Sequence, residues 1–169
     1  MSRLDTLVEQ LRTVLGDRAQ DITVALGEVT LRVKAADHVE VARRLRDDPA
    51  LRFDTLVDLC GVDYQSYGDG GWSGLRFASV MHLLSVEKNW RLRVRTFCPD
   101  DDFPLIASVT EIWPAANWYE RESFDLMGIP FRGHPNLTRI LMADDWEGHP
   151  LRKDYDVGRI PVQFKGANS

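Results

Sequence analysis

Hydrophobic residues follow two patterns along the chain, one with helical spacing and one with strand spacing. Between Ser2, which can cap a helix, and Gly16, which can end one, apolar residues recur every three or four positions. This stripe consists of Leu4, Leu7, Val8, Leu11 and Leu15. A second helix is predicted after Asp37, because Asp37 and Glu40 have the spacing of a capping box. A third helix is predicted over residues 114–128.

Apolar and polar residues alternate over residues 29–34 and 90–98, and residues 77–86 form a short apolar run, so β-strands are predicted over these three segments. The segment 77–86 is apolar on both sides, so we expect it in the centre of a sheet, and the three residues after it form a predicted hairpin loop. Residues 62–75 are rich in Gly, Ser and Asp and predict an exposed loop. The polar positions of the last strand are Arg91, Arg93 and Arg95. This row is expected on the outer face of the sheet.

The order of these elements predicts an α+β fold, in which helices pack on one face of an antiparallel sheet. We place this globular domain at residues 1–130. Residues 131–169 show no periodicity and are rich in Gly and Pro, so we expect a long extended C-terminal tail.

The tail is nevertheless too apolar and aromatic for a disordered segment. It contains Phe131, Trp146, Tyr155 and several aliphatic side chains that require a surface to cover them. We expect that surface to belong to a partner protein. The alternative is that the tail packs back across its own domain.

Charge and motifs narrow the range of functions. The net charge of −5 argues against nucleic acid as the main partner. The longest apolar runs are too short to span a membrane, so membrane association is expected only through another protein. Cys60 and Cys98 are expected to be small buried residues. Metal-binding and nucleotide-binding spacings are lacking, so we expect no cofactor in this chain.

One dense cluster of charged residues lies in the third predicted helix, with Glu120, Arg121, Glu122 and Asp125. A charged face that binds the tail or a partner is one interpretation. An acid–base enzyme that uses Glu122, Asp125 and His134 is another. The enzyme interpretation lacks any motif for a substrate pocket.

The sequence from Glu120 to Pro135 resembles the family of the C subunit of respiratory complex I, the NADH:quinone oxidoreductase. Its continuations over residues 137–141 and 145–155 resemble the same family, which also occurs in membrane-bound hydrogenases. Thr138 stands where the family usually has a second arginine, and Asp156 stands where it usually has a proline. These departures weaken the carry-over of residue roles at those two positions.

The resemblance implies a cofactor-free docking subunit in the peripheral arm of a proton-pumping complex, on the cytoplasmic side of the cell membrane. It implies that the D subunit, which holds the quinone site, is the chief partner, with the B and I subunits nearby. NADH, FMN, the Fe–S clusters and quinone would bind to other subunits. The equivalent subunit of a membrane-bound hydrogenase is the alternative host.

Together, the charged helix and the tail define the residues that we expect to bind partners. They are Glu120, Arg121, Glu122, Asp125, Phe131, Arg132, His134, Arg139, Trp146, Arg152, Lys153, Asp154 and Tyr155. No catalytic residue is expected in this chain alone.

Overall fold

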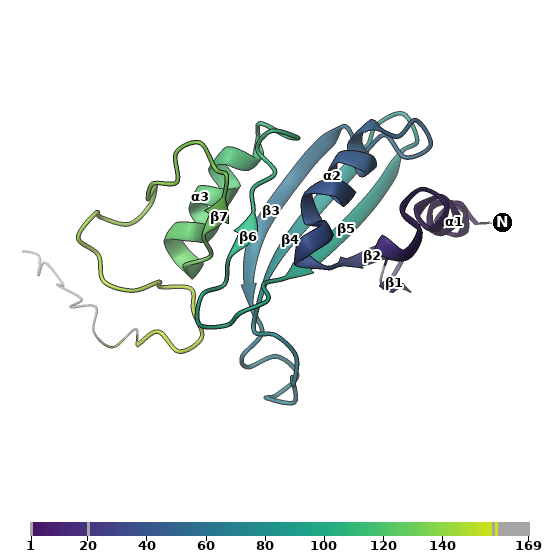
Figure 1. Ribbon diagram of the computed structural model, residues 1–169. Coiled ribbons are helices and arrows are strands. Elements are labelled where there is room, and N and C mark those ends of the chain that lie inside the picture. The colour runs from purple at the N-terminus through teal and green to yellow at the C-terminus, as the bar shows by residue number, and fades with distance from the viewer. Residues whose placement is uncertain (1, 20, 157, 159–169) are drawn as a thin grey trace, which may run out of the picture.

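A five-stranded sheet with the order β1-β2-β5-β4-β3 is the centre of the computed structural model, which describes residues 2–19, 21–156 and 158 (Figure 1). Its strands are β1 (Asp21–Ala25), β2 (Glu28–Val33), β3 (Thr55–Asp63), β4 (Phe77–Ser85) and β5 (Trp90–Phe97). The α-helices are α1 (Arg3–Leu15), α2 (His38–Asp47) and α3 (Ala116–Met127). Shorter elements are the 3₁₀ helices η1 (Gly16–Arg18) and η2 (Ala35–Asp37) and the paired strands β6 (Ile106–Ala107) and β7 (Phe131–Arg132).

The predicted α+β fold is confirmed, but the sheet is not wholly antiparallel. β1–β2, β3–β4 and β4–β5 are antiparallel pairs, whereas β2 and β5 run parallel. The reason is topological: α2 carries the chain across the sheet from β2 to the far edge, and the β3–β4–β5 meander then returns β5 to the side of β2. The edge strands β1 and β3 were not predicted.

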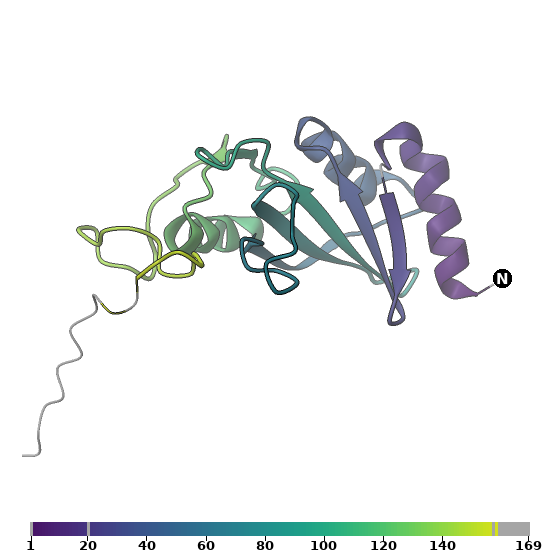
Figure 2. The same ribbon diagram turned by 90° about the horizontal axis from the view of Figure 1, so that it is seen from below.

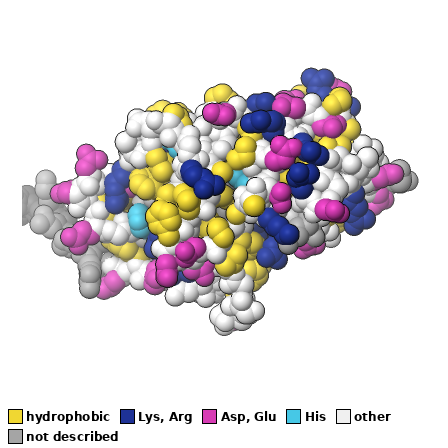
Figure 3. All heavy atoms as spheres, viewed as in Figure 1, with side chains coloured by type: hydrophobic (Ala, Val, Ile, Leu, Met, Phe, Trp, Pro, Cys, Tyr) yellow, Lys and Arg dark blue, Asp and Glu magenta, His cyan; other side chains and the backbone are white. Residues whose placement is uncertain are grey.

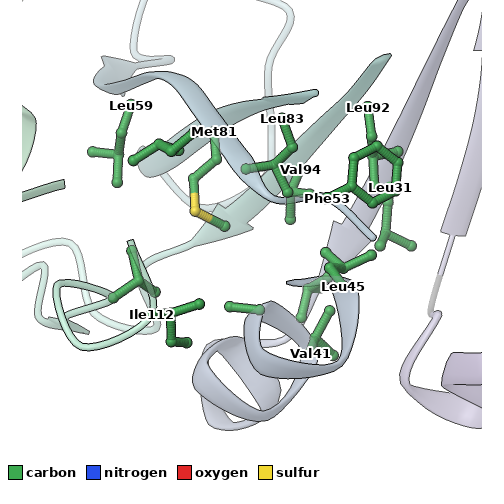
Figure 4. Close-up of a cluster of buried hydrophobic side chains, with 14 of the residues drawn as sticks. Leu31, Val41, Leu45, Phe53, Leu59, Met81, Leu83, Leu92, Val94 and Ile112 are labelled. Atoms are coloured by element: carbon green, nitrogen blue, oxygen red, sulfur yellow. The ribbon is translucent and has the colours of Figure 1, made fainter. Parts of the chain in front are cut away.

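α1 and α2 cover one face of the sheet and form the main core with it. Figure 4 shows Val41 and Leu45 of α2 facing side chains such as Leu83 and Leu92 of the sheet. Ser2 and Asp5 form a reciprocal cap at the start of α1, where Ser2 was the predicted capping residue. Burial of these apolar stripes accounts for the position of both helices.

α3 does not lie on that face but runs along the edge strand β3 (Figure 1). The backbone N–H of Gly61 donates to Ser123 Oγ at 3.0 Å, and the Tyr119 hydroxyl donates to the carbonyl of Val57 at 3.1 Å. A Cβ at Gly61 would lie 2.9 Å from Cδ1 of Ile129, so glycine allows this close approach without displacing that side chain. The helix therefore satisfies backbone groups of an otherwise open sheet edge.

The opposite face of the sheet carries the arginine row, as predicted. Here the loop after β3 folds over a second, smaller apolar cluster, which differs from the fully exposed loop expected for residues 62–75. Tyr64 is buried, and the Trp72 ring stacks on Phe97 with 5.5 Å between centroids. Arg95 lies over the Tyr64 ring, 5.5 Å from its centroid.

A buried histidine makes the stability of this core depend on pH. His38 is 1% exposed, hydrogen-bonds with Thr96 Oγ1 at 3.0 Å, and has no partner for Nε2 among the described residues. Burial lowers the pKa of His38 from 6.5 to about 4. Its contribution is therefore complete above pH 6.5 and is lost as the pH falls towards 4.

We predict that His38→Gln removes this acid-dependent loss. The wild-type protein should lose up to about 3 kcal/mol from this group between pH 6.5 and 4, so its stability advantage over the variant should shrink by that amount. Urea unfolding at pH 7 and pH 4.5 measures the change, with His82→Gln on the outer sheet face as the control. A stability difference that is the same at both pH values would contradict the prediction.

Candidate functional site

The described part of the tail returns along α3 (Figure 1) and is tied to it by side chains from both the helix and the tail. In the middle of α3, the Arg121 guanidinium donates to the carbonyls of Thr138 at 3.0 Å and Arg139 at 3.2 Å. At the end of α3, the Arg152 guanidinium donates to the carbonyls of Met127 at 2.8 Å and Gly128 at 3.2 Å. The tail thus binds the helix at two separate points.

Asp125 is the central contact between helix and tail. Its side chain is fully buried, and Oδ2 accepts the backbone N–H groups of Ile140, Leu141 and Met142 at 3.0, 2.8 and 2.9 Å. Oδ1 accepts a bond from Arg139 at 3.1 Å. Burial alone would raise the pKa of Asp125, but these donors outweigh it and hold the pKa below its ordinary value. One carboxylate therefore accepts the backbone N–H groups of an irregular segment, which have no hydrogen-bond acceptors in a helix or strand.

A second buried carboxylate fixes the tail to the sheet. Asp63 accepts the backbone N–H of Lys153 at 2.9 Å and a guanidinium N–H of Arg76 at 2.7 Å. The same guanidinium bridges to Asp154 at 2.8 Å. Burial works against the ionised form of Asp63, but these donors keep its pKa below the ordinary value.

The end of α3 leaves no room for a side chain. Gly128 has φ +66°, and a Cβ there would lie 2.4 Å from the His149 ring and 2.5 Å from Arg152. His149 Nδ1 lies 2.9 Å from the carbonyl of Asp125. Two constraints therefore favour glycine at position 128: the positive φ of its backbone and the tail side chains that pack against it.

Glu120 supports a different loop on the other side of α3. It is fully buried and accepts the Ser108 hydroxyl at 2.6 Å and the Val109 N–H at 2.7 Å. Burial raises the pKa of Glu120 to about 7, although both hydrogen bonds favour the ionised form.

The structure divides the thirteen residues that we expected to bind partners into three groups. Glu120, Asp125 and Phe131 are buried with their contacts inside this chain, so they support a surface and do not form one. Side chains that bond to their own chain but remain partly accessible or exposed are Arg121, His134, Arg139, Arg152 and Asp154. Exposed or half-buried members are Glu122, Arg132, Trp146, Lys153 and Tyr155. Partner binding by these last two groups remains a prediction.

Residues 131–155 therefore pack on their own domain more than we expected. Phe131 is 2% exposed and pairs with Ile106 in the β6–β7 bridge, so the core continues past the predicted boundary at residue 130. That boundary stays a prediction. Residues 157 and 159–169, where we also expected partner contacts, lie outside the described residues.

The geometry does not favour the acid–base interpretation of Glu122, Asp125 and His134. Both oxygens of Asp125 are engaged by the tail, and His134 lies 3.2 Å from the carbonyl of Asn117 and accepts the N–H of Asn136 at 3.0 Å. Glu122 faces solvent. Within the described chain, no group of three His, Cys, Asp or Glu residues is arranged to hold a metal ion.

Sequence reasoning missed the most exposed aromatic residue of this region. Trp118 on α3 is 64% exposed, and the Arg121 guanidinium stacks over its ring at 5.1 Å from the centroid. Leu141, on the adjacent tail segment, is 62% exposed. We call Trp118, Arg121, Glu122 and Leu141 the α3–tail surface. The sequence indicated this surface only through the spacing of Trp118 and Glu122, which are four residues apart and so lie on one side of the predicted helix.

We predict that Asp125→Asn destabilises the protein by about 3 kcal/mol, because the neutral amide loses the charge that attracts three N–H groups and Arg139. Hydrogen exchange at the amides of residues 140–142 should accelerate together with this loss. Urea unfolding and exchange mass spectrometry measure the two effects. Glu122→Gln, an exposed neighbour on the same helix, should change neither, and an Asp125→Asn protein with slow amide exchange at residues 140–142 would refute the assignment.

The contribution of Glu120 to stability should change with pH in the opposite direction from that of His38. Its folded pKa lies above the unfolded value of 4.5, so its contribution is complete below pH 4.5 and is lost as the pH rises through about 7. Glu120→Gln should therefore become more stable relative to wild type by about 2–3 kcal/mol between pH 4.5 and pH 8. Thermal unfolding at the two pH values tests this, and a constant difference would show that Glu120 titrates normally.

Sequence comparisons connect this arrangement to known proteins. The profile of the family described as "Respiratory-chain NADH dehydrogenase, 30 Kd subunit" matches residues 31–160. The C subunit of NADH-quinone oxidoreductase from Burkholderia cenocepacia (strain HI2424) is 60% identical over 164 residues, which cover 96% of this chain and 82% of the relative. The protein of the same name from Cupriavidus pinatubonensis (strain JMP 134 / LMG 1197) is 59% identical over 165 residues, 97% and 83% of the two chains.

Solved structures share the fold. A trypsin-resistant fragment of Nqo5 aligns with a TM-score of 0.62 at 32% identity, over 80% of this chain and 100% of the fragment. A chain of the membrane-bound sulfane sulfur reductase, an archaeal respiratory membrane complex, aligns with a TM-score of 0.74 at 25% identity, over 92% and 87%. Of the helices in the described residues, none combines the length and hydrophobicity needed to cross a membrane. The sequence match extends over most of the chain, and the chain accordingly belongs to the respiratory-chain NADH dehydrogenase 30 Kd subunit family.

Proposed function

We propose that this chain is a cofactor-free docking subunit in the peripheral arm of a proton-pumping NADH:quinone oxidoreductase, on the cytoplasmic side of the cell membrane. It supports electron transfer from NADH, through FMN and Fe–S clusters held by other subunits, to quinone. Its chief partner is the D subunit, which holds the quinone site, with the B and I subunits as further neighbours. Family membership and the names of the relatives support this host.

The α3–tail surface is the observation that carries the docking role. Trp118 and Leu141 expose large apolar side chains that a monomeric protein would gain by covering. Tryptophan and arginine are the residue types that most often dominate the binding energy of interfaces. Figure 3 shows hydrophobic side chains grouped among charged ones on the half of the molecule that contains α3 and the tail.

The side chains of this surface are held by contacts within the chain itself. Arg121 is held by Thr138 and Arg139 on one side and by the Trp118 ring on the other. Leu141 is fixed by its own N–H bond to Asp125. Side chains that are already immobilised lose little conformational entropy on binding, so the same contact area gives a higher affinity.

The equivalent subunit of another respiratory membrane complex is the second candidate. The TM-score of 0.74 with a chain of the sulfane sulfur reductase complex favours it. The 60% identity with the NADH-quinone oxidoreductase C subunit, over 96% of this chain, supports the first host more strongly than 25% identity supports the second.

We predict that Trp118→Ala weakens association with the rest of the complex about 30-fold, the effect of losing a hot-spot residue worth about 2 kcal/mol. The measurement is titration of the tagged chain against a complex purified without it. Phe103→Ala, which removes another exposed ring (57%), is the matched control and should bind like wild type. Wild-type affinity of the Trp118→Ala chain would exclude the α3–tail surface as the docking site.

A further inference from the structure

The C-terminal end of α3 is satisfied only in part by the chain that directly follows it. A helix leaves its last carbonyl groups without partners inside the helix, so they need donors from elsewhere. The N–H of Gly128 donates to the Phe124 carbonyl at 3.0 Å, and the N–H of Ile129 points to the residue before Phe124. Pro130 comes next and has no N–H. The carbonyls of residues 125–128 therefore depend on a more distant part of the chain.

Residues 149–152 of the tail supply these donors. Figure 2 shows the yellow end of the described tail beside α3, as Figure 1 does. The N–H of Leu151 donates to the Leu126 carbonyl at 3.0 Å. His149 Nδ1 lies 2.9 Å from the Asp125 carbonyl, and because a carbonyl oxygen only accepts, Nδ1 carries the proton. A main-chain group and a ring thus satisfy two of the four carbonyls.

Arg152 satisfies the other two. Its guanidinium donates to the carbonyls of Met127 at 2.8 Å and Gly128 at 3.2 Å, and it lies 4.8 Å from the centroid of the Phe77 ring. A cation is favoured at this place, because the aligned peptide dipoles give the C-terminal end of a helix a partial negative charge. All four carbonyls therefore have a donor from the tail. We call residues 149–152 the α3 cap.

Asp125 joins the α3 cap to a second segment of the tail. Its main-chain carbonyl bonds to His149, whereas its side chain accepts the N–H groups of residues 140–142. Unwinding of the last turn of α3 would therefore disturb both sets of bonds at once. The second segment includes Leu141 of the α3–tail surface and follows Arg139, whose carbonyl holds the Arg121 guanidinium. A change at the cap can thus reach that surface through the helix end.

Few buried apolar contacts oppose an opening of this region. After Phe131, every described residue of the tail keeps part of its surface accessible. The segment is held mainly by hydrogen bonds at the attachment points already described. Segments with little apolar burial open locally, at a lower free energy than global unfolding requires.

We propose that the α3 cap, the last turn of α3 and residues 139–142 open and close as one cooperative unit, and that only the closed form presents the α3–tail surface to a partner. Arg152 is then a positioning residue that acts through the helix end and not a partner contact. This inference rests on the proposed docking role, because it names what holds the docking surface in its binding form.

Hydrogen exchange of the purified full chain tests the unit with Arg152→Gln. The amides of residues 140–142 and of Gly128 should exchange faster together, by at least about tenfold, because the unit loses charge-assisted bonds. Arg152→Lys should accelerate them less, since the ammonium keeps the charge at the helix end. Arg43→Gln removes the same charge from an exposed position of α2 and should leave these rates unchanged. Amides of the inner strand β4 should stay slow in every variant, which shows that the fold persists.

Binding to a complex purified without this subunit tests the second part of the proposal. The double variant with His149→Ala and Arg152→Gln lacks three of the four cap bonds and should populate the open form most. Its affinity should fall by the same factor as its closed fraction, which exchange in the free chain measures, because only the closed form binds.

Slow exchange at residues 140–142 after the replacement of Arg152 would overturn the cooperative unit. An affinity that falls while the closed fraction does not would identify His149 or Arg152 as a direct partner contact, which also overturns the proposal. If the closed fraction falls and the affinity does not, the unit stands but the α3–tail surface is not the docking site. Wild-type affinity of the Trp118→Ala chain would show that failure of the docking surface independently.

Discussion

The structure depends on buried carboxylates that bind the backbone of an irregular segment. Residues 134–155 contain no helix or strand, so their N–H groups need acceptors from elsewhere when they pack against protein. Asp125 accepts three consecutive N–H groups and Asp63 accepts a fourth. Without them the segment would have to stay hydrated, and Arg121 would lose the carbonyls that orient it beside Trp118. The proposed docking surface is thus a consequence of charge buried beneath it.

One edge of the sheet is closed by a helix. At β3, α3 supplies Ser123 and Tyr119 to backbone groups. The same helix carries Asp125, which binds the tail, and Trp118, which is exposed. The helix that closes the edge therefore also holds the tail and carries the proposed docking surface.

Periodicity located the helices and the three inner strands, because each buries a continuous apolar stripe. It did not find β1, whose residues are mostly exposed, or β3, whose burial pattern is mixed and whose register shifts. It could not give the parallel β2–β5 pairing, because half-buried strands alternate identically in either direction. The acidic helix was the harder case. Glu120 and Asp125 resemble solvated charges in sequence, yet their donors lie 11 to 17 residues away in the chain. An apolar tail likewise indicates that a surface must cover it, but not whether that surface belongs to the same chain.

Two of the buried titratable groups, His38 and Glu120, act against each other. As the pH falls from 6.5 to 4.5, protonation of the unfolded chain at His38 destabilises the native state, whereas protonation of native Glu120 stabilises it. The pKa of His38 falls from 6.5 to about 4 and that of Glu120 rises from 4.5 to about 7, so the two contributions have similar size and opposite sign. The two contributions therefore partly cancel across this window. The wild-type profile hides part of both titrations, and single substitutions separate the histidine of α2 from the glutamate of α3.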